Sequence, residues 1–258
     1  MIMKIDKKYK IAVIGLGYVG LPLALAFGKT MSVLGFDNDP ERVGELKKGL
    51  DRNNELNLKL KRYSKNIVFS SNDISLKKCN IFIITVPTPI KKNNIPDLSF
   101  LTSACRKVGK YLKKNSIVII ESTVYPGCTE ELCVPILEKI SKLKFNKDFF
   151  CGYSPERVNP GDKKHTINKI TKVISGSNQD TQKKIKYLYK KITNKIYVAQ
   201  NIKVAESAKV IENIQRDLNI AFMNEISIIL KKMKIRTKDV LKAASTKWNF
   251  LNFTPGLV

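Results

Sequence analysis

Three glycines in the chain have the spacing G-x-G-x-x-G: Gly15, Gly17 and Gly20. They follow a short apolar segment, residues 11–14, and precede a second apolar segment, residues 21–29. In a strand–turn–helix unit the first glycine allows a sharp turn, the second lets the backbone approach a pyrophosphate, and the third lets helix and strand pack closely. The helix N-terminus then directs unpaired N–H groups at the phosphates. The motif predicts a dinucleotide site; a glycine-rich turn without a ligand is the alternative.

An acidic residue, Asp37, ends the next predicted strand, residues 31–36. It comes about 20 residues after Gly15, the spacing found in dinucleotide-binding folds. Its carboxylate can accept hydrogen bonds from a ribose hydroxyl and would repel a 2′-phosphate. We therefore predict NAD, rather than NADP, as the cofactor.

Apolar strand segments alternate with helical segments through residues 1–200, the predicted first domain. After the glycine-rich unit, strands are predicted at residues 81–86, 116–121, 149–152, 172–175 and 196–198. This alternation predicts a Rossmann-like α/β fold with a doubly wound, mostly parallel sheet. Ligands bind such sheets at the carboxyl ends of the strands, and Thr88, Thr123 and Glu156 each come just after a predicted strand. For the two threonines, capping of a turn is the alternative role.

Residues 201–258 are predicted to begin an all-α domain that is incomplete. It starts with a long helix over residues 203–233, which contain no proline or glycine. Apolar residues recur there every three or four positions, and the stripe is wide enough to bury two faces. We therefore expect this helix to mediate a homodimer. Lys209, Asn213 and Arg216 lie on one face of it, and by spacing alone a solvated polar face is the preferred explanation for them.

The chain is strongly basic, since 47 lysines and arginines against 22 acidic residues give a formal net charge of +25. Such a charge could serve nucleic-acid binding. The lysines, however, are spread in pairs along the whole sequence, whereas nucleic-acid binders concentrate arginines and aromatic residues in one stripe. We attribute the charge to a lysine-rich composition and predict no nucleic-acid partner.

Cysteine and histidine usage restricts the remaining chemistry. The chain has five cysteines, without a CxxC pair, and one histidine. One histidine cannot anchor a histidine-based metal site, so we predict no metal. Five cysteines in a chain of this length do not suggest a disulfide framework. We expect the thiols to be buried or free in a reducing compartment, and we predict a cytoplasmic protein.

An uncharged segment, residues 11–27, follows the basic residues 4–10 and could be read as a signal peptide or a membrane anchor. Its three glycines and Pro22 would each weaken a continuous helix. The segment also divides naturally into the strand, turn and helix described above. We therefore predict no membrane segment here, and no later segment is long and apolar enough to span a bilayer.

Five ordered motifs resemble those of the UDP-glucose/GDP-mannose dehydrogenase family. They are Gly15-Leu-Gly-Tyr-Val-Gly-Leu-Pro-Leu, Val86-Pro-Thr-Pro, Glu121-Ser-Thr-Val-Tyr-Pro-Gly, Ser154-Pro-Glu-Arg-Val-Asn-Pro-Gly and Ala205-Glu-Ser-Ala-Lys-Val-Ile-Glu-Asn. Two further segments resemble the family branch, of the Vi-antigen type, that acts on UDP-N-acetylhexosamines for bacterial surface polysaccharides. These are Asn213-Ile-Gln-Arg-Asp-Leu-Asn-Ile-Ala and Thr246-Lys-Trp-Asn-Phe. The resemblance runs from Lys10 to the last residue.

The resemblance implies an NAD-dependent oxidation of the C6 alcohol of the UDP-sugar to a carboxylate, with two NAD molecules used in turn. In the family a cysteine attacks the intermediate aldehyde, and the resulting thioester is hydrolysed. The matching cofactor-binding positions, besides the three glycines, are Tyr18, Val19, Asp37, Thr88 and Thr123, with Arg42 at the adenosine end. The matching substrate-binding positions are Arg157, Val158, Lys209, Asn213 and Arg216.

The same resemblance implies the catalytic roles. Lys209 would stabilise the developing oxyanion or move a proton, and Asn213 would donate a hydrogen bond to the oxyanion. Glu156 would act as the general base in thioester hydrolysis, and Thr123 is placed in the same catalytic set. With this resemblance, a functional role for Lys209 and Asn213 is preferred over a solvated polar face.

One departure from the family pattern is large. The family's catalytic cysteine follows Pro-Gly-Leu-Val directly, in a Gly-Gly-His-Cys-Ile-Gly segment, and here Pro255-Gly-Leu-Val are the last residues given. None of the five cysteines matches that position, and the family's C-terminal nucleotide-sugar domain is absent from these residues. We therefore expect a truncated gene product, a fragment, or a chain that needs its other half elsewhere, inactive by itself. A non-catalytic NAD-binding dimerisation module, a UDP-glucose 6-dehydrogenase and a 3-hydroxyacid dehydrogenase are the alternatives.

Overall fold

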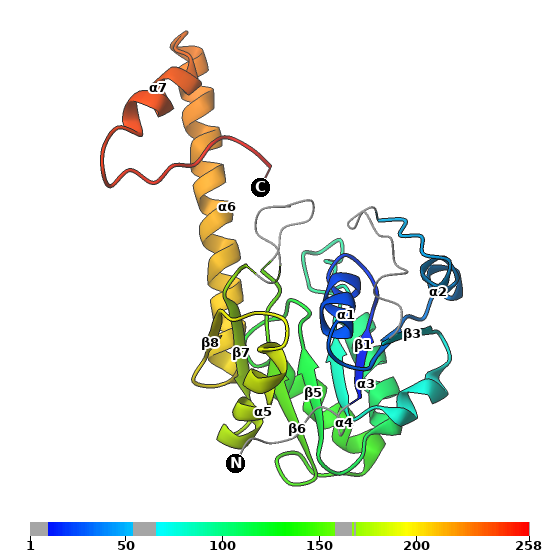
Figure 1. Cartoon of the computed structure of the whole chain (residues 1–258). Helices are drawn as coiled ribbons and strands as arrows, with labels where there is room; N and C mark the ends of the chain where they lie inside the picture. Colours follow the sequence, from blue (N-terminus) through cyan, green and yellow to red (C-terminus); the bar gives the residue numbers. More distant parts are fainter. Residues whose placement is uncertain (1–9, 54–65, 158–166, 168, 258) are drawn as a thin grey trace. The chain divides into compact units, whose positions relative to one another are not determined.

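The computed structural model describes residues 10–53, 66–157, 167 and 169–257 (Figure 1). The chain divides into two compact units, Met1–Ser207 and Ala208–Val258. The first unit is built around one sheet, and the second consists of helices and an extended tail.

The first unit contains an eight-stranded sheet with the order β3-β2-β1-β4-β5-β6-β7-β8. Its strands are β1 (Ile11–Ile14), β2 (Val33–Phe36), β3 (Ile67–Ser70), β4 (Ile81–Ile84), β5 (Ser116–Ile120), β6 (Phe149–Tyr153), β7 (Lys172–Gly176) and β8 (Ile196–Val198). Neighbouring strands pair in parallel, except for β6 and β7, which are antiparallel. The predicted doubly wound, mostly parallel sheet is confirmed. Its order reverses between β1 and β4, where folds of this kind bind ligands.

Successive residues of the central strands enter different hydrophobic cores. Ala12 and Ile14 of β1 pack in one core, to which α3 and α4 contribute, and Ile11 and Val13 pack in another, to which α1 and α5 contribute. The helices are α1 (Gly20–Gly28), α2 (Pro40–Lys47), α3 (Ser99–Tyr111), α4 (Val134–Ser141) and α5 (Gln179–Tyr189), with the short helices η2 (Asp73–Lys78) and η3 (Thr129–Cys133). Because both faces are covered, the central strands are apolar at nearly every position.

The cysteines follow the same burial pattern. All five are free thiols, and all five are buried in the first unit. Within the described residues, no group of three or more histidine, cysteine or acidic side chains is arranged to hold a metal ion.

The long predicted helix is α6 (Ile202–Lys232), and it is followed by α7 (Thr237–Ala244). The first turn of α6 contributes Ile202 and Ala205 to a core of the first unit. In the second unit Asn224 forms two hydrogen bonds with the backbone of Gly256, each 2.9 Å long, and these hold the tail on α6. Among the described residues of this unit, Met223 is the only buried one.

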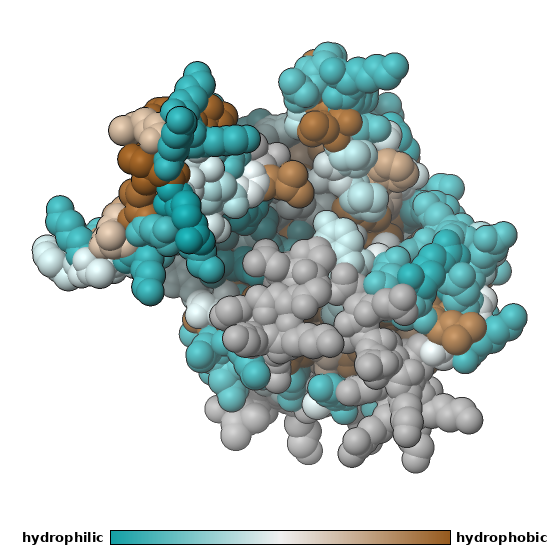
Figure 2. All heavy atoms as spheres, turned by 90° about the horizontal axis from the view of Figure 1, so that it is seen from above, coloured by the Kyte–Doolittle hydropathy of each residue, from teal (hydrophilic) through white to brown (hydrophobic). Residues whose placement is uncertain are grey.

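Large apolar side chains therefore lie open to water in the second unit. Figure 2 shows hydrophobic side chains exposed at the surface among hydrophilic ones. The exposed apolar residues of α6 from the second unit are Ile211, Ile214, Leu218, Phe222, Ile228 and Ile229. No helix in the described part of the chain has both the length and the apolar character needed to cross a bilayer.

Candidate functional site

The glycine-rich loop folds against the carboxyl end of β4. Gly15 has a φ of +92°, in the left-handed region that favours glycine, and Thr85 Oγ1 donates to its carbonyl oxygen over 2.8 Å. A Cβ atom on Gly20 would lie 1.8 Å from the Gly15 oxygen, whereas one on Gly17 would meet nothing within 4 Å. The backbone conformation at the first glycine and the close contact at the third thus require glycine. The second glycine leaves open space through which a ligand can approach the backbone of the loop.

The loop leads into α1 without a side-chain cap. The N-cap residue is Val19, whose side chain cannot accept a hydrogen bond, and Tyr18 before it is 57% exposed. An uncapped helix N-terminus with an open glycine beside it fits a pyrophosphate, because backbone N–H groups are left to donate to the anion. The residues present therefore fit the nucleotide cofactor that the motif predicts.

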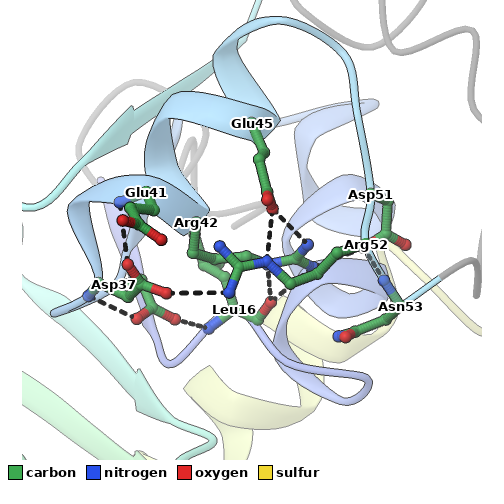
Figure 3. A network of polar contacts seen from close by, with 9 residues as sticks. Leu16, Asp37, Glu41, Arg42, Glu45, Asp51, Arg52 and Asn53 are labelled. Atoms are coloured by element: carbon green, nitrogen blue, oxygen red, sulfur yellow. Dashed lines mark hydrogen bonds and ion pairs between the residues drawn. The ribbon is translucent and has the colours of Figure 1, made fainter.

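Asp37 and Arg42 hold the Leu16 peptide of this loop (Figure 3). Asp37 accepts hydrogen bonds from the Leu16 amide over 2.7 Å and from the Asp39 amide over 3.0 Å. Arg42 is buried, and its guanidinium donates to the Leu16 carbonyl over 3.1 and 3.0 Å and to Asp51 over 2.6 Å. Asp37 thus lies beside the loop, and Arg42 supports the loop from within. Contact of Arg42 with the adenosine end stays a prediction.

Threonines and serines join the strand ends next to the loop. Thr88, after β4, donates from Oγ1 to the carbonyl of Thr123, after β5, over 2.8 Å. Ser122 Oγ donates to the carbonyl of Val86 over 2.7 Å. Two residues predicted for the cofactor site, 35 positions apart in the chain, are therefore brought together at the carboxyl edge of the sheet.

A buried ionic cluster, which we call the lysine cluster, lies at the segment that follows β6. It consists of Lys172, Glu121, Glu156 and Tyr189. Lys172 Nζ lies 2.7 Å from a Glu121 oxygen and 3.6 Å from a Glu156 oxygen, and it donates to the Pro155 carbonyl over 3.2 Å. The Tyr189 hydroxyl donates to the other Glu121 oxygen. Because β7 runs antiparallel to β6, the first residue of β7 lies at the end of β6, where Glu156 follows.

Burial and charge together set the protonation of the lysine cluster. Burial raises the pKa of Glu121, the Glu156 carboxylate adds to this effect, and Lys172 opposes it. Burial alone would lower the pKa of Lys172, but the two carboxylates outweigh it and raise the pKa above its ordinary value. Lys172 therefore remains a cation at neutral pH and places a fixed positive charge beside Glu156.

The predicted substrate residues fall in both units. In the first, an Arg157 Nη atom donates to the Thr171 carbonyl over 3.0 Å, and Val158 lies outside the described residues. In the second, Arg216 donates to Asn213 Oδ1 over 3.0 Å, so these two lie together on α6. Lys209 lies on the same helix, four residues before Asn213 and thus on the same face.

The sequence pattern did not predict that Lys172 is the cation of the lysine cluster or that Asp51 pairs with Arg42. Lys172, Tyr189 and Asp51 were given no role, and Glu121 served only as part of a motif. One signal was available, because Glu121 and Lys172 are charged residues directly at the ends of apolar strands. Which of them would pair depends on the antiparallel placement of β7, and the sequence pattern does not indicate that direction.

Two family models match the chain. The model described as the UDP-glucose/GDP-mannose dehydrogenase family, NAD binding domain, matches residues 9–193, and the model of the family's central domain matches residues 203–258. The cofactor predicted from the glycine motif and Asp37 is therefore confirmed as NAD.

Individual relatives agree with this match. A UDP-N-acetyl-D-glucosamine 6-dehydrogenase of Pseudomonas aeruginosa is 55% identical over 98% of this chain and 60% of its own length. Protein CapL of Staphylococcus aureus is 55% identical over 96% of this chain and 58% of its own. The solved UDP-D-ManNAc dehydrogenase of Pyrococcus horikoshii is 32% identical, with a TM-score of 0.89 over 96% of this chain and 60% of its own.

The chain thus spans about 60% of the length of the curated relatives it matches. The first family model alone covers well over half of the 258 residues, and the two models together follow the two parts of the chain in order. The chain belongs to the UDP-glucose/GDP-mannose dehydrogenase family.

Proposed function

We propose that this chain forms the NAD-binding and central part of an enzyme that oxidises the C6 alcohol of a UDP-N-acetylhexosamine to the uronic acid, for surface polysaccharide synthesis. The proposal rests on the hydrogen bonds and ion pairs that connect residues at the carboxyl ends of neighbouring strands. Contacts run from the glycine loop through Thr85 to β4, from Thr88 to Thr123, and from the adjoining Glu121 through Lys172 to Glu156. The substrate class comes from the relatives, whose names specify UDP-N-acetylhexosamines.

NAD, when bound, accepts the hydride that leaves C6 of the sugar. The amides at the start of α1 would hold its pyrophosphate, and Asp37 would accept from the adenosine ribose. Thr88 and Thr123 would contact the nicotinamide end, because the hydrogen bond from the Thr88 hydroxyl to the Thr123 carbonyl holds the two strand ends together beside the glycine loop. This arrangement serves orientation, which is a major part of catalysis in hydride transfer.

We assign the acid–base work to Lys209, Asn213 and Glu156. We assign to Lys209 the stabilisation of the developing alkoxide or the removal of its proton, and to Asn213 a hydrogen bond to the oxyanion. Glu156 would activate the water that hydrolyses the thioester intermediate. Arg157, Val158 and Arg216 are assigned to the nucleotide sugar. A reducing compartment suits five free thiols, so we place the protein in the cytoplasm.

The test joins these 258 residues to the remaining part of the Pseudomonas aeruginosa relative. The purified chimera is mixed with NAD and one UDP-sugar, and NADH absorbance is followed. We expect two NADH per UDP-N-acetylhexosamine consumed, and loss of turnover in Lys209→Met while NAD binding persists. Oxidation of UDP-glucose alone would favour a UDP-glucose 6-dehydrogenase instead. If the chimera folds and binds NAD but oxidises no UDP-sugar, the result would favour a non-catalytic NAD-binding dimerisation module.

We also propose that the protein is a homodimer through the apolar face of α6. Ile211, Leu218 and Phe222 recur at helical spacing, and each is at least 58% exposed in the single chain. A continuous apolar stripe of this kind is characteristic of a surface that a partner covers. A second copy is the natural partner, since symmetric dimers are the commonest oligomers.

Sedimentation of a matched pair of variants tests the dimer. Leu218→Asp should convert the dimer to a monomer, because a carboxylate cannot be buried unpaired in the interface. Val68→Asp, at an equally exposed apolar residue of β3 (65% against 64%), should remain dimeric. A monomeric unaltered chain, or equal behaviour of the two variants, would overturn the proposal.

A further inference from the structure

The segment that follows β2 carries an unusual charge pattern for so basic a chain. Five carboxylates and two guanidinium groups lie between residues 37 and 52, and we call this set the arginine cluster. Its members are Asp37, Asp39, Glu41, Arg42, Glu45, Asp51 and Arg52. In Rossmann folds an acidic residue here accepts from the ribose of NAD, and a nearby arginine accommodates the 2′-phosphate of NADP. This chain holds both kinds of residue.

The first arginine is committed to the protein. Arg42 donates to the Leu16 carbonyl and lies 2.6 Å from Asp51, and the side chains of Arg42 and Asp51 are only 6% and 3% exposed. Its remaining Nη atom is buried and lies 3.8 Å from Glu45. Reaching a phosphate would require Arg42 to give up its support of the loop.

The second arginine is held by two carboxylates at the surface. Arg52 Nε lies 2.6 Å from Glu45, and an Arg52 Nη atom lies 3.2 Å from Asp39. Asp39 in turn donates its amide to Asp37 over 3.0 Å, so Asp39 contacts both Arg52 and the carboxylate that we assign to the ribose. Figure 3 shows Arg52 extended between the Asp37 side of the cluster and Glu45.

We propose that Glu45 and Asp39 are specificity-determining residues, because they occupy Arg52 and thereby deny a 2′-phosphate the cation it would otherwise bind. Asp37 repels the phosphate directly, and the Arg52 partners form a second barrier behind it. The inference rests on the NAD-binding site and not on the identity of the sugar. It therefore stands or falls separately from the proposed oxidation of a UDP-N-acetylhexosamine.

The second barrier has a consequence for changing the cofactor. Removal of Asp37 alone takes away the direct repulsion but leaves Arg52 neutralised, so the affinity for NADP should rise only slightly. Freeing Arg52 as well offers the phosphate a charge-assisted hydrogen bond, which contributes more than a bond between neutral groups.

The test measures dissociation constants of NAD and NADP for the 258-residue chain by titration calorimetry. Asp37→Ser/Glu45→Gln is compared with Asp37→Ser/Glu41→Gln, since both lose one carboxylate of α2 and only Glu45 holds Arg52. We expect the Glu45 variant to bind NADP about tenfold tighter than its match, the order of one charge-assisted hydrogen bond. Adding Arg52→Met should abolish that gain.

Thermal unfolding of each variant provides the control for folding. Equal NADP affinity in the two folded double variants would overturn the proposal, because loss of charge alone would then explain the effect. A gain that survives Arg52→Met would overturn it as well, since Arg52 would not be the group that binds the phosphate. If the unaltered chain bound neither nucleotide, the proposal would also be overturned, because it depends on a nucleotide site in this chain.

Discussion

Lys172 and Arg52 are both cations held by two carboxylates, yet they lie in opposite environments. The side chains of Lys172 and Glu121 are fully buried, whereas Arg52 is 42% exposed and its partner Glu45 33%. Water cannot replace a lost partner in the interior, so a buried ionic cluster must stay complete. Exposed ion pairs are screened and exchange with water at little cost. The lysine cluster can therefore fix the backbone that carries Glu156, while the arginine cluster acts on the charge of an incoming ligand.

Lys172→Met should give the largest effect. We expect the free energy of unfolding at neutral pH to fall by about 3–5 kcal/mol, because Glu121 is left buried without its cation. Urea unfolding measures this loss. The loss should shrink as the pH falls toward the ordinary carboxyl value of 4.5, because burial raises the folded-state pKa of Glu121 and its protonation removes the unpaired buried charge. A simple packing defect would show no such pH dependence.

Two further variants sharpen the comparison. Glu121→Gln/Lys172→Met removes both buried charges and should recover part of the stability that Lys172→Met loses. Arg52→Met removes a cation with the same number of carboxylate partners and should change stability little. Equal losses in Lys172→Met and Arg52→Met would contradict the contrast between buried and exposed pairs.

Two glycines of the same loop offer a second contrast between closed and open positions. Gly20→Ala places a Cβ atom 1.8 Å from the Gly15 oxygen, and we expect it to lower the free energy of unfolding by about 1–3 kcal/mol. Gly17→Ala meets no protein atom within 4 Å, so stability should be retained while NAD affinity falls. Calorimetry for NAD and urea unfolding separate the two effects. Loss of stability in Gly17→Ala would show that this position is closed.

The sequence predicted the parts of the site that depend on local geometry. The turn at Gly15, the close packing at Gly20 and an acid after β2 follow from the strand–turn–helix unit itself, and a single stretch of chain carries them all. Thr88 and Thr123 were placed correctly at strand ends because parallel strands end at one edge of the sheet. Their hydrogen bond follows from the pairing of β4 with β5.

Contacts between distant segments could not be predicted in this way. Lys172 pairs with Glu121 across 51 positions, and the pairing depends on the antiparallel direction of β7 beside β6. The partners of Arg42 and Arg52 depend on how the chain after α2 folds back on that helix. The stripe on α6 has a different limit: a wide apolar stripe on a helix indicates burial, but the pattern is the same whether the chain itself or a second chain covers it.

Substitution of Asp39, an exposed carboxylate of the arginine cluster, should change stability least. It is the N-cap residue of α2 and accepts from the Glu41 amide over 2.9 Å. Hydrogen bonds from the backbone of Arg42 and Glu41, and the charge of Arg52, hold the pKa of Asp39 below the ordinary 3.8. A lowered folded-state pKa means that the stabilising contribution is complete above pH 3.8 and is lost as the pH falls through the folded value.

Asp39→Asn keeps the cap, because asparagine also accepts from the helix amides, but it removes the charge. We expect the unaltered chain to be slightly more stable than this variant near neutral pH, and the difference to vanish in acid below the folded-state pKa. Urea unfolding across the acid range measures it.

The converse substitution is available at Asn178, the uncharged N-cap residue of α5, which accepts from the Thr181 amide over 2.8 Å. Asn178→Asp should introduce the acid sensitivity that Asp39→Asn removes, since the carboxylate gains the same interaction with a helix N-terminus. If both variants followed the unaltered chain at every pH, the exposed carboxylate would contribute through hydrogen bonding alone, and charge would matter to stability only in the buried lysine cluster.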